Sequence, residues 1–481
     1  MGAVRAIPDD EWRLLRIIVF AVGVVLLVLA AGGALNSTLF VKPTTTKYLV
    51  TVGGCAFIVI LTTVASPLKL LVGLAIVVAP IDFVMTFSGL RITPLIGVDL
   101  LALIVALPRT RRGTAALRPM SLVFAALLLP SIMISNGPGR WLVWIAFILA
   151  TGWLTYLIAC EPGGPAFIAI MLAIGALLQG AIAIWEFKSG HQLNLYSASD
   201  STTASSSAFF RFGSLLRPSG AAPDPIGLGQ ILALCVPVSV ALAASVRRLA
   251  ASIVVVAMTG VAMLGLVLSL SRLSIVGALA GLAVALVLLP RAVKARTTIF
   301  VAGAGFIVAL VGISVGGRGL TARINSILHP TAAHVKTASG DLQRTHIWAA
   351  AWKTGQQHPL AGVGLGNITK FLPEHGVAVT AAAHAHDTYL QFFAESGVIG
   401  LLGLLGLLAA AGLDLRRAWS SQRIWVAGAA GALVATLLAW TTDVEIRYLQ
   451  VSAMVAVLLG LIAALADRQP EEKAALRSAV P

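Results

Sequence analysis

The stretch AASIVVVAMTGVAMLGLVLSLSRLSIVGALAGLAVALVLL, residues 250–289, contains one charged side chain, Arg272. A helix needs about 20 mainly apolar residues to cross the hydrocarbon core of a bilayer, which is about 30 Å thick. The stretch is long enough to cross twice, and its serines and its arginine lie near the middle. It therefore predicts two spanning helices, at 250–270 and 273–290, joined by a tight polar turn.

The composition of the whole chain favours the same environment. Of its 481 residues, 58% are hydrophobic and 11% are charged, and the mean hydropathy is +0.94. Soluble domains carry about a quarter charged residues, so lipid is the solvent that fits. The net charge of +15 is of the kind found in nucleic-acid-binding proteins. Here, however, the basic residues recur in short clusters between apolar runs, which is the pattern of a membrane protein. We therefore expect no nucleic-acid partner.

Apolar runs of spanning length recur along the chain. The first is longer than the apolar core of a signal peptide, so we expect it to stay attached. The fourth is short and contains Asp99, so it is either a span or a re-entrant segment. The sequence predicts an all-α polytopic membrane protein with about 12–14 transmembrane helices. The predicted spans are 17–35, 48–65, 67–87, 92–108, 119–135, 141–159, 165–187, 225–245, 250–270, 273–290, 298–315, 396–413, 424–441 and 447–466.

The orientation follows from the lysines and arginines in the connections between spans. With the N-terminus in the cytoplasm, the inner connections hold roughly nineteen of these residues and the short outer connections roughly six. In membrane proteins, the cytoplasmic connections contain more lysine and arginine than the external connections. Both termini are therefore predicted to be cytoplasmic, and both long loops external.

Two long connections divide the spans into blocks. The first has a Ser-rich middle, for which a flexible connector is the plain interpretation. The second is too rich in aromatic and apolar residues for a disordered linker. The predicted divisions are 1–187 (N-terminal spans), 188–224 (external Ser-rich loop), 225–315 (central spans), 316–395 (large external loop), 396–466 (C-terminal spans) and 467–481 (cytoplasmic tail).

The large external loop has recognisable local patterns. Its stretch DLQRTHIWAAAWKTG has helical spacing, with an apolar stripe predicted at Ile347, Ala350, Ala351 and Trp352. The segment GVGLGN at 362–367 superficially resembles a nucleotide-binding loop, but no strand or ribose-binding acid accompanies it. We expect instead a turn whose backbone passes close to a neighbouring element.

The single charge of the opening stretch has two interpretations. An arginine this close to the hydrocarbon core is costly unless it faces a polar cavity or a partner. Arg272 either extends to the lipid headgroups or points into a cavity and binds an anion, for which the planar guanidinium with its bidentate hydrogen bonds is well suited. Arg217, in LLRPSGAAPDP, and Arg344, on the predicted loop helix, lie on the same predicted face.

The segment HAHD, residues 384–387, lies just before a predicted span. A neutral imidazole such as that of His386 can take a proton from an attacking hydroxyl, and a carboxylate such as that of Asp387 can orient the ring. Zinc binding is the rival interpretation. The spacing differs from the helical H-E-x-x-H pattern, and no cysteine adjoins. The segment therefore favours acid–base chemistry over a metal site.

The order of four motifs resembles the O-antigen ligase and polymerase superfamily of bacterial envelope glycosyltransferases. The motifs are RPSGAAPDPIGLGQILAL, SLSRLSIVGALAG, QRTHIWAAAWKTGQQHPLAGVGLGN and HAHDTYLQFFAESGVIGLLGLL, and together they extend over roughly residues 211–405. Two positions depart from the family pattern. Asp387 stands where the family usually has Asn, and Asp224 and Pro225 stand where Asn-Pro-Asn is common. Ligase and polymerase activities both stay open.

The resemblance implies a GT-C-like architecture and a glycosyltransferase of the cytoplasmic (inner) membrane, without metal or cofactor, that works on the periplasmic face and inverts the anomeric centre. The implied donor is a glycan on undecaprenyl pyrophosphate. The implied acceptor is a sugar hydroxyl, either on a glycolipid such as lipid A–core or on another lipid-linked glycan. This chemistry belongs to polysaccharide or lipopolysaccharide biosynthesis in the cell envelope. The alternatives are an O-antigen or exopolysaccharide polymerase, and a transporter or flippase of lipid-linked glycans.

This chemistry suggests a role for each candidate residue. A lipid pyrophosphate gains negative charge as the glycosidic bond breaks, and preorganised arginines stabilise that charge. The arginines expected at the pyrophosphate are Arg217, Arg272 and Arg344. His386 is the expected base for the acceptor hydroxyl, and Asp387 is expected to orient it. Supporting roles are expected for His384, Tyr389 and His346.

Overall fold

A computed structural model describes residues 66–81, 85–87, 90–110, 119–191, 211–212, 215–328, 341–377, 384–441 and 445–468. The chain divides into two units, Met1–Leu71 and Val72–Pro481. Apart from the first turn of one helix, the described residues belong to the second unit. The predicted spans at 17–35 and 48–65 lie outside the described residues.

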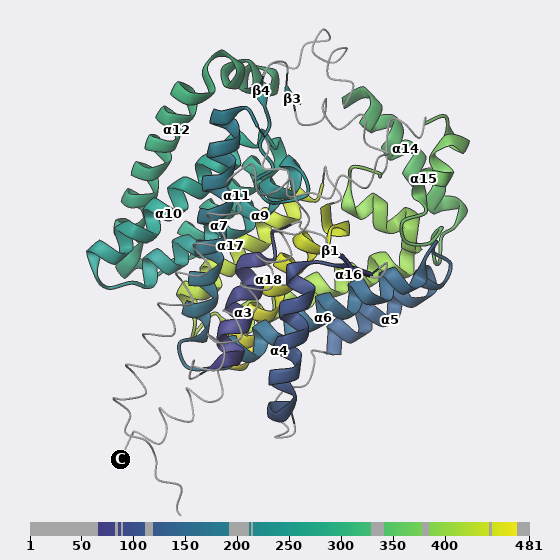
Figure 1. The fold of residues 1–481 in the computed structure, drawn as a ribbon, viewed down its shortest axis with the longest axis horizontal. Coiled ribbons are helices and arrows are strands. Elements are labelled where there is room, and N and C mark those ends of the chain that lie inside the picture. Colours follow the sequence, from purple (N-terminus) through teal and green to yellow (C-terminus); the bar gives the residue numbers. More distant parts are fainter. Residues whose placement is uncertain are drawn as a thin grey trace, which may run out of the picture. The chain divides into compact units, whose positions relative to one another are not determined.

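Helices dominate the described residues, which confirms the predicted all-α membrane fold (Figure 1). The N-terminal and central helices are α3 (Pro67–Val78), α4 (Pro94–Thr110), α5 (Pro119–Met133), α6 (Pro138–Cys160), α7 (Gly164–Ser189), α9 (Pro225–Ser245), α10 (Leu249–Leu268), α11 (Arg272–Leu288) and α12 (Arg291–Leu328). The remaining helices are α14 (Asp341–Gln357), α15 (Ile368–Phe371), η1 (Leu372–His375), α16 (Thr388–Ala418), α17 (Arg423–Ala439), η2 (Glu445–Arg447) and α18 (Leu449–Asp467).

Seven of the described helices are long and apolar enough to cross a membrane. They are α6, α7, α9, α10, the Arg291–Gly312 part of α12, α16 and α18. Shorter apolar helices lie within the predicted spans that begin at 67, 92, 119, 273 and 424. The chain is therefore a polytopic membrane protein.

Four short strands form two antiparallel hairpins that the hydrophobic pattern did not predict. β1 (Met85–Phe87) pairs with β2 (Leu90–Ile92), and β3 (Arg211–Phe212) pairs with β4 (Leu215–Leu216). The predicted span 67–87 was consequently too long, because α3 ends at Val78. Pro80 follows at once, and proline lacks the N–H that would continue the helix.

The helix α9 lies at the centre of a packed group that also contains α7, α10, α11 and α17 (Figure 1). Every residue of α9 from Pro225 to Ala244 is buried. Small residues let the neighbouring backbones approach closely, as is usual between helices in lipid. Any side chain placed on Gly281 of α11 would collide with the carbonyl of Gly431 on α17. This group therefore forms a tightly packed core within the second unit.

The helix α14 packs on the start of α16 and covers a small apolar core of its own. Ile347, Ala350 and Ala351 are almost fully buried there, which confirms three positions of the predicted stripe. The fourth position was wrong, because Trp352 is 50% exposed. Residues 347, 350 and 351 share one face of a helix, whereas residue 352 lies to its side. Trp352 instead contacts the ring of Phe393, with centroids 5.0 Å apart.

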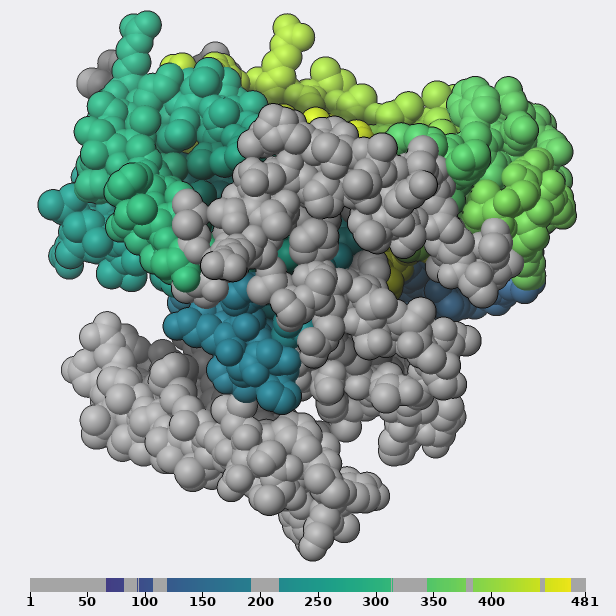
Figure 2. Space-filling model, turned by 90° about the horizontal axis from the view of Figure 1, so that it is seen from above, coloured from purple at the N-terminus to yellow at the C-terminus, as the bar shows by residue number. Residues whose placement is uncertain are grey.

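Gly397 breaks α16 with a left-handed φ of 63°, and the glycine-rich turn fills the break. The N–H groups of Val363 and Gly364 donate to the carbonyls of Ala394 and Glu395 at 3.0 and 2.9 Å. In return, the N–H of Val398 donates to the carbonyl of Pro359 at 2.8 Å. These bonds confirm the prediction that GVGLGN passes close to a neighbouring element. Figure 2 shows the green atoms of this region gathered beside the blue atoms of α5 and α6.

Candidate functional site

A buried carboxylate and a buried amide on α7 shape the loop that carries Arg217. The Glu186 side chain is fully buried, and its Oε2 atom accepts the N–H groups of Ser219 and Gly220 at 2.9 and 2.8 Å. The Oε1 atom of Gln179 accepts the N–H of Ala221 at 2.8 Å. Backbone groups left unpaired in a buried loop are costly, so these two acceptors hold the loop in one conformation.

The same loop leads directly into α9. The Oδ1 atom of Asp224 accepts the N–H groups of Ile226 and Gly227 at 2.8 and 2.7 Å, and Pro225 occupies the first turn. An aspartate at the N-cap followed by proline is a strong helix start. The part of the loop between Arg217 and α9 is therefore held by α7 and by the start of α9.

Arg217 extends from this loop to the turn that carries Arg272. The Nε–H of Arg217 donates to the carbonyl of Ser269 at 3.2 Å. Leu270 follows with a left-handed φ of 56°, and α11 begins at Arg272. The structure thus brings Arg217 and Arg272, which are far apart in sequence, into adjacent turns. Both arginines are partly buried.

The turn itself is polar and internally bonded. The Oγ atoms of Ser271 and Ser274 lie 2.8 Å apart. Both serines are buried, and Gly229 of α9 passes so close to them that a side chain there would collide with Ser271. The start of α11 is therefore fixed against α9, and with it the backbone from which Arg272 extends.

The HAHD segment forms a second polar cluster at the start of α16. The rings of His384 and His386 lie with centroids 4.2 Å apart. His386 has a left-handed φ of 53°, and its carbonyl accepts the indole N–H of Trp348 at 3.4 Å. The N–H of Ala385 donates to the Oε1 atom of Gln391 at 2.7 Å. Contacts from α14 and α16 thus hold the two imidazoles together.

Asp387 is the N-cap of α16. Its Oδ1 atom accepts the N–H of Leu390 at 2.8 Å. Burial raises the pKa of this carboxyl above 3.8, while bonds from the N–H groups of Leu390 and Tyr389 act in the opposite direction. Its orienting role toward His386 stays a prediction.

Two arginines act electrostatically on His384. Burial, followed by the influence of His386, Arg447 and Arg344, lowers the pKa of His384 well below 6.5. Desolvation and nearby positive charges both disfavour the imidazolium. His384 is therefore neutral at physiological pH, and the two arginines that act on it, Arg344 and Arg447, are positive.

The sequence-based prediction did not include Arg447 in the site. This arginine belongs to η2, in the last turn before α18. The turn was recognisable as polar and external, but no sequence pattern linked it to the histidines, which lie more than 50 residues earlier. Glu186 and Gln179 were missed as well, because a polar residue on an apolar helix does not show which loop it binds.

The other two residues predicted to support the site, Tyr389 and His346, lie outside the pair of imidazoles. The Tyr389 hydroxyl donates to the carbonyl of Leu437 at 3.2 Å, which ties α16 to α17. His346 is exposed on α14. Among the residues that the structure describes, no group of three or more His, Cys, Asp or Glu side chains is placed to hold a metal ion.

The two clusters lie at the same end of the helical core. Gly277 of α11 packs against Ala435 of α17, and Gly281 against Gly431, so these helices are antiparallel. Five residues before Gly277, Arg272 is therefore level with Trp440 at the end of α17. The carbonyl of Trp440 accepts the N–H of Thr388, the first residue of α16, at 2.9 Å. The end of α17 thus connects the arginine turns to the histidine cluster.

Comparison with known protein families finds one match. The family described as O-antigen ligase matches residues 253–405. The matched segment includes Arg272, Arg344, His384 and His386, whereas Arg217 and Arg447 lie outside it. The match confirms the predicted resemblance, and it covers three of the four motifs, because RPSGAAPDPIGLGQILAL lies before residue 253. No curated protein matches the chain.

Proposed function

We propose that this chain transfers a glycan from undecaprenyl pyrophosphate to a sugar hydroxyl at the periplasmic face of the cytoplasmic membrane. The match of residues 253–405 to the family described as O-antigen ligase supports this proposal. Glycan transfer of the ligase or polymerase kind is the activity of the family. The observation that carries the proposal further is the pair of imidazoles with arginines from two other elements beside them.

The arginines act on the donor. As the bond between the anomeric carbon and the pyrophosphate oxygen breaks, negative charge grows on the pyrophosphate. Fixed positive groups stabilise that charge more in the transition state than in the ground state. Arg217 and Arg272 approach from adjacent turns, and Arg344 from α14. We add Arg447 to this set because it acts on His384 from the opposite element, η2.

The histidines act on the acceptor. The imidazole of His386 accepts the proton of the acceptor hydroxyl while the hydroxyl oxygen bonds to the anomeric carbon and the pyrophosphate departs. Attack opposite to the leaving group inverts the anomeric centre. His384 is neutral, so it places no further positive charge beside the base. This arrangement leaves His386 able to take up the proton.

The location follows from the substrate. A prenyl chain stays in the bilayer, so the reacting pyrophosphate has to be bound near the membrane surface. Both clusters lie at the ends of apolar helices, at the start of α11 and of α16. The excess of basic residues in the other set of connections supports a periplasmic location for this end, with both termini in the cytoplasm.

A variant in cells tests the proposal. Replacing His386 by Ala is expected to abolish the surface glycan while the protein remains inserted in the membrane. A normal amount of surface glycan in the His386→Ala strain would overturn the role of His386.

A deletion strain separates the two activities of the superfamily. Loss of all polymer from the acceptor, with lipid-linked polymer accumulating, identifies a ligase. A product with a single repeat unit identifies a polymerase. Loss of surface glycan, with the unjoined lipid-linked precursor retained on the cytoplasmic side, would instead identify a flippase.

A further inference from the structure

An apolar groove lies between two closely packed helix pairs at the other end of the second unit. One pair is α6 and α18, where a side chain on Gly460 would collide with the carbonyl of Gly152. The other pair is α5 and α16, where a side chain on Gly406 would meet Met120. Two adjoining cavities, of about 70 and about 320 Å³, lie along the seam and share lining residues such as Ser121, Leu407 and Ala463.

The groove has the length of one acyl chain. Its lining on α16 runs from Leu407 to Arg417, which is about 15 Å at 1.5 Å per residue. The hydrocarbon core of a bilayer is about 30 Å thick, so the groove is as deep as one leaflet. Leu413 at its rim is 53% exposed, so the groove opens onto the surface that lipid surrounds.

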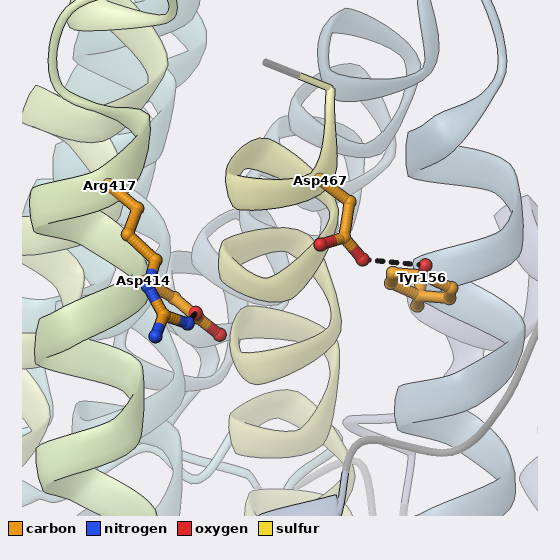
Figure 3. A network of polar contacts seen from close by, with 4 residues as sticks. All are labelled: Tyr156, Asp414, Arg417 and Asp467. Atoms are coloured by element: carbon orange, nitrogen blue, oxygen red, sulfur yellow. Dashed lines mark hydrogen bonds and ion pairs between the residues drawn. The ribbon is translucent and has the colours of Figure 1, made fainter. Parts of the chain in front are cut away.

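The mouth of the groove, whose lining is mainly apolar, carries an ion pair with an exposed cation. Arg417 and Asp414 extend from α16 toward α18, while Tyr156 on α6 meets Asp467 at the end of α18 (Figure 3). The Nη1 atom of Arg417 lies 3.0 Å from the Oδ1 atom of Asp414. The arginine side chain is 65% exposed, whereas that of the aspartate is 12% exposed. The outermost charge at the mouth is therefore positive.

We propose that this groove binds one anionic phospholipid, with an acyl chain between the two helix pairs and its phosphate on Arg417. The exposed guanidinium matches an anionic headgroup, and basic residues at the membrane surface attract anionic lipids. The Oη of Tyr156 donates to Asp467 at 2.8 Å, so that carboxylate is held by α6 and lies away from Arg417 in Figure 3.

The glycan donor is not the occupant of this groove. Arg417 is 19 positions after Val398, the first residue beyond the break in α16, which corresponds to about 30 Å along the unbroken part of the helix. A lipid with its phosphate on Arg417 therefore has its headgroup at the opposite membrane surface from the His384 and His386 cluster. The proposal consequently does not depend on the proposed transfer reaction.

Native mass spectrometry of the purified full chain with added lipid tests this proposal. We expect phosphatidylglycerol to bind about fivefold more tightly than phosphatidylcholine, which is the effect of one basic residue at the membrane surface. The Arg417→Gln variant should bind both lipids equally. The matched control is Arg416→Gln, which removes the same charge from an exposed neighbour outside the groove and should keep the preference.

Two further variants separate lipid binding from a purely structural ion pair. Asp414→Asn releases the guanidinium from its carboxylate and should tighten phosphatidylglycerol binding, whereas a purely structural pair predicts no gain. Ala410→Phe fills the groove and should remove binding of both lipids. Equal affinity of the wild-type chain for the two lipids, or equal losses in Arg417→Gln and Arg416→Gln, would overturn the proposal. If Ala410→Phe does not fold, the comparison of Arg417→Gln with Arg416→Gln still tests lipid binding in the groove.

Discussion

His384 is the residue on which burial and neighbouring charge act most strongly in the site. Its pKa lies well below 6.5 because of burial, His386 and two arginines. The unfolded chain therefore binds a proton below pH 6.5 that the folded chain does not, and the free energy of unfolding should fall as the pH drops through that value. Above it, the effect is absent.

Thermal unfolding at about pH 7.5 and about pH 5 measures this dependence. The wild-type chain should lose more stability on acidification than His384→Gln, because glutamine carries no titrating group. His375, which is half-buried in the same loop, supplies the matched control His375→Gln, which should behave as the wild type. Equal pH dependence in all three proteins would contradict the assignment.

Arg272 tests whether the site needs a guanidinium or only a positive charge. Arg272→Lys keeps the charge but loses the planar fork that binds two phosphate oxygens at once. We expect the transfer rate to fall by about tenfold or more, as for the loss of one charge-stabilising donor. The control Arg291→Lys changes an exposed arginine at the start of α12 and should retain full activity. Full activity of Arg272→Lys would refute bidentate binding.

Elements were more predictable than the contacts between them. Apolar runs predicted most of the described long helices, because a helix that crosses the bilayer has to be mainly apolar over about 20 residues. The two short hairpins were not predicted, because strands of two or three residues are too short to show an alternating hydrophobic pattern. Glu186 and Arg447 were not predicted as site residues for a different reason. Each acts on a loop distant in sequence, and a single sequence does not reveal that contact.

The break in α16 gives a prediction at this scale. Gly397 has a left-handed φ, and a side chain there would collide with the carbonyl of Leu360. Gly397→Ala should therefore destabilise the protein by about 1–3 kcal/mol or more. Gly412, later on the same helix, has open space around it, so Gly412→Ala should be neutral or stabilise by about 0.5–1 kcal/mol. Thermal unfolding in detergent compares the two, and similar shifts would show that the break is not required.

At the scale of the whole molecule, the proposed reaction requires that the end of the helices that carries His384 and His386 faces the periplasm. Thr345 is exposed on α14, and Ser420 is exposed in the turn between α16 and α17. With the three native cysteines replaced by alanine, Thr345→Cys should react with a membrane-impermeant maleimide in intact spheroplasts. Ser420→Cys should react only after the membrane is opened. The reverse pattern would place the candidate site in the cytoplasm, away from the proposed donor.

Formation of a glycosidic bond by the purified protein tests the central claim most directly. The wild-type chain in lipid nanodiscs, given a glycan on undecaprenyl pyrophosphate and a sugar acceptor, should yield the joined glycan and free lipid pyrophosphate in equal amounts. His386→Ala should yield neither, while Arg291→Lys, at the exposed start of α12, should retain most of the activity. No joined product from the wild-type chain, or equal product from His386→Ala, would contradict the account.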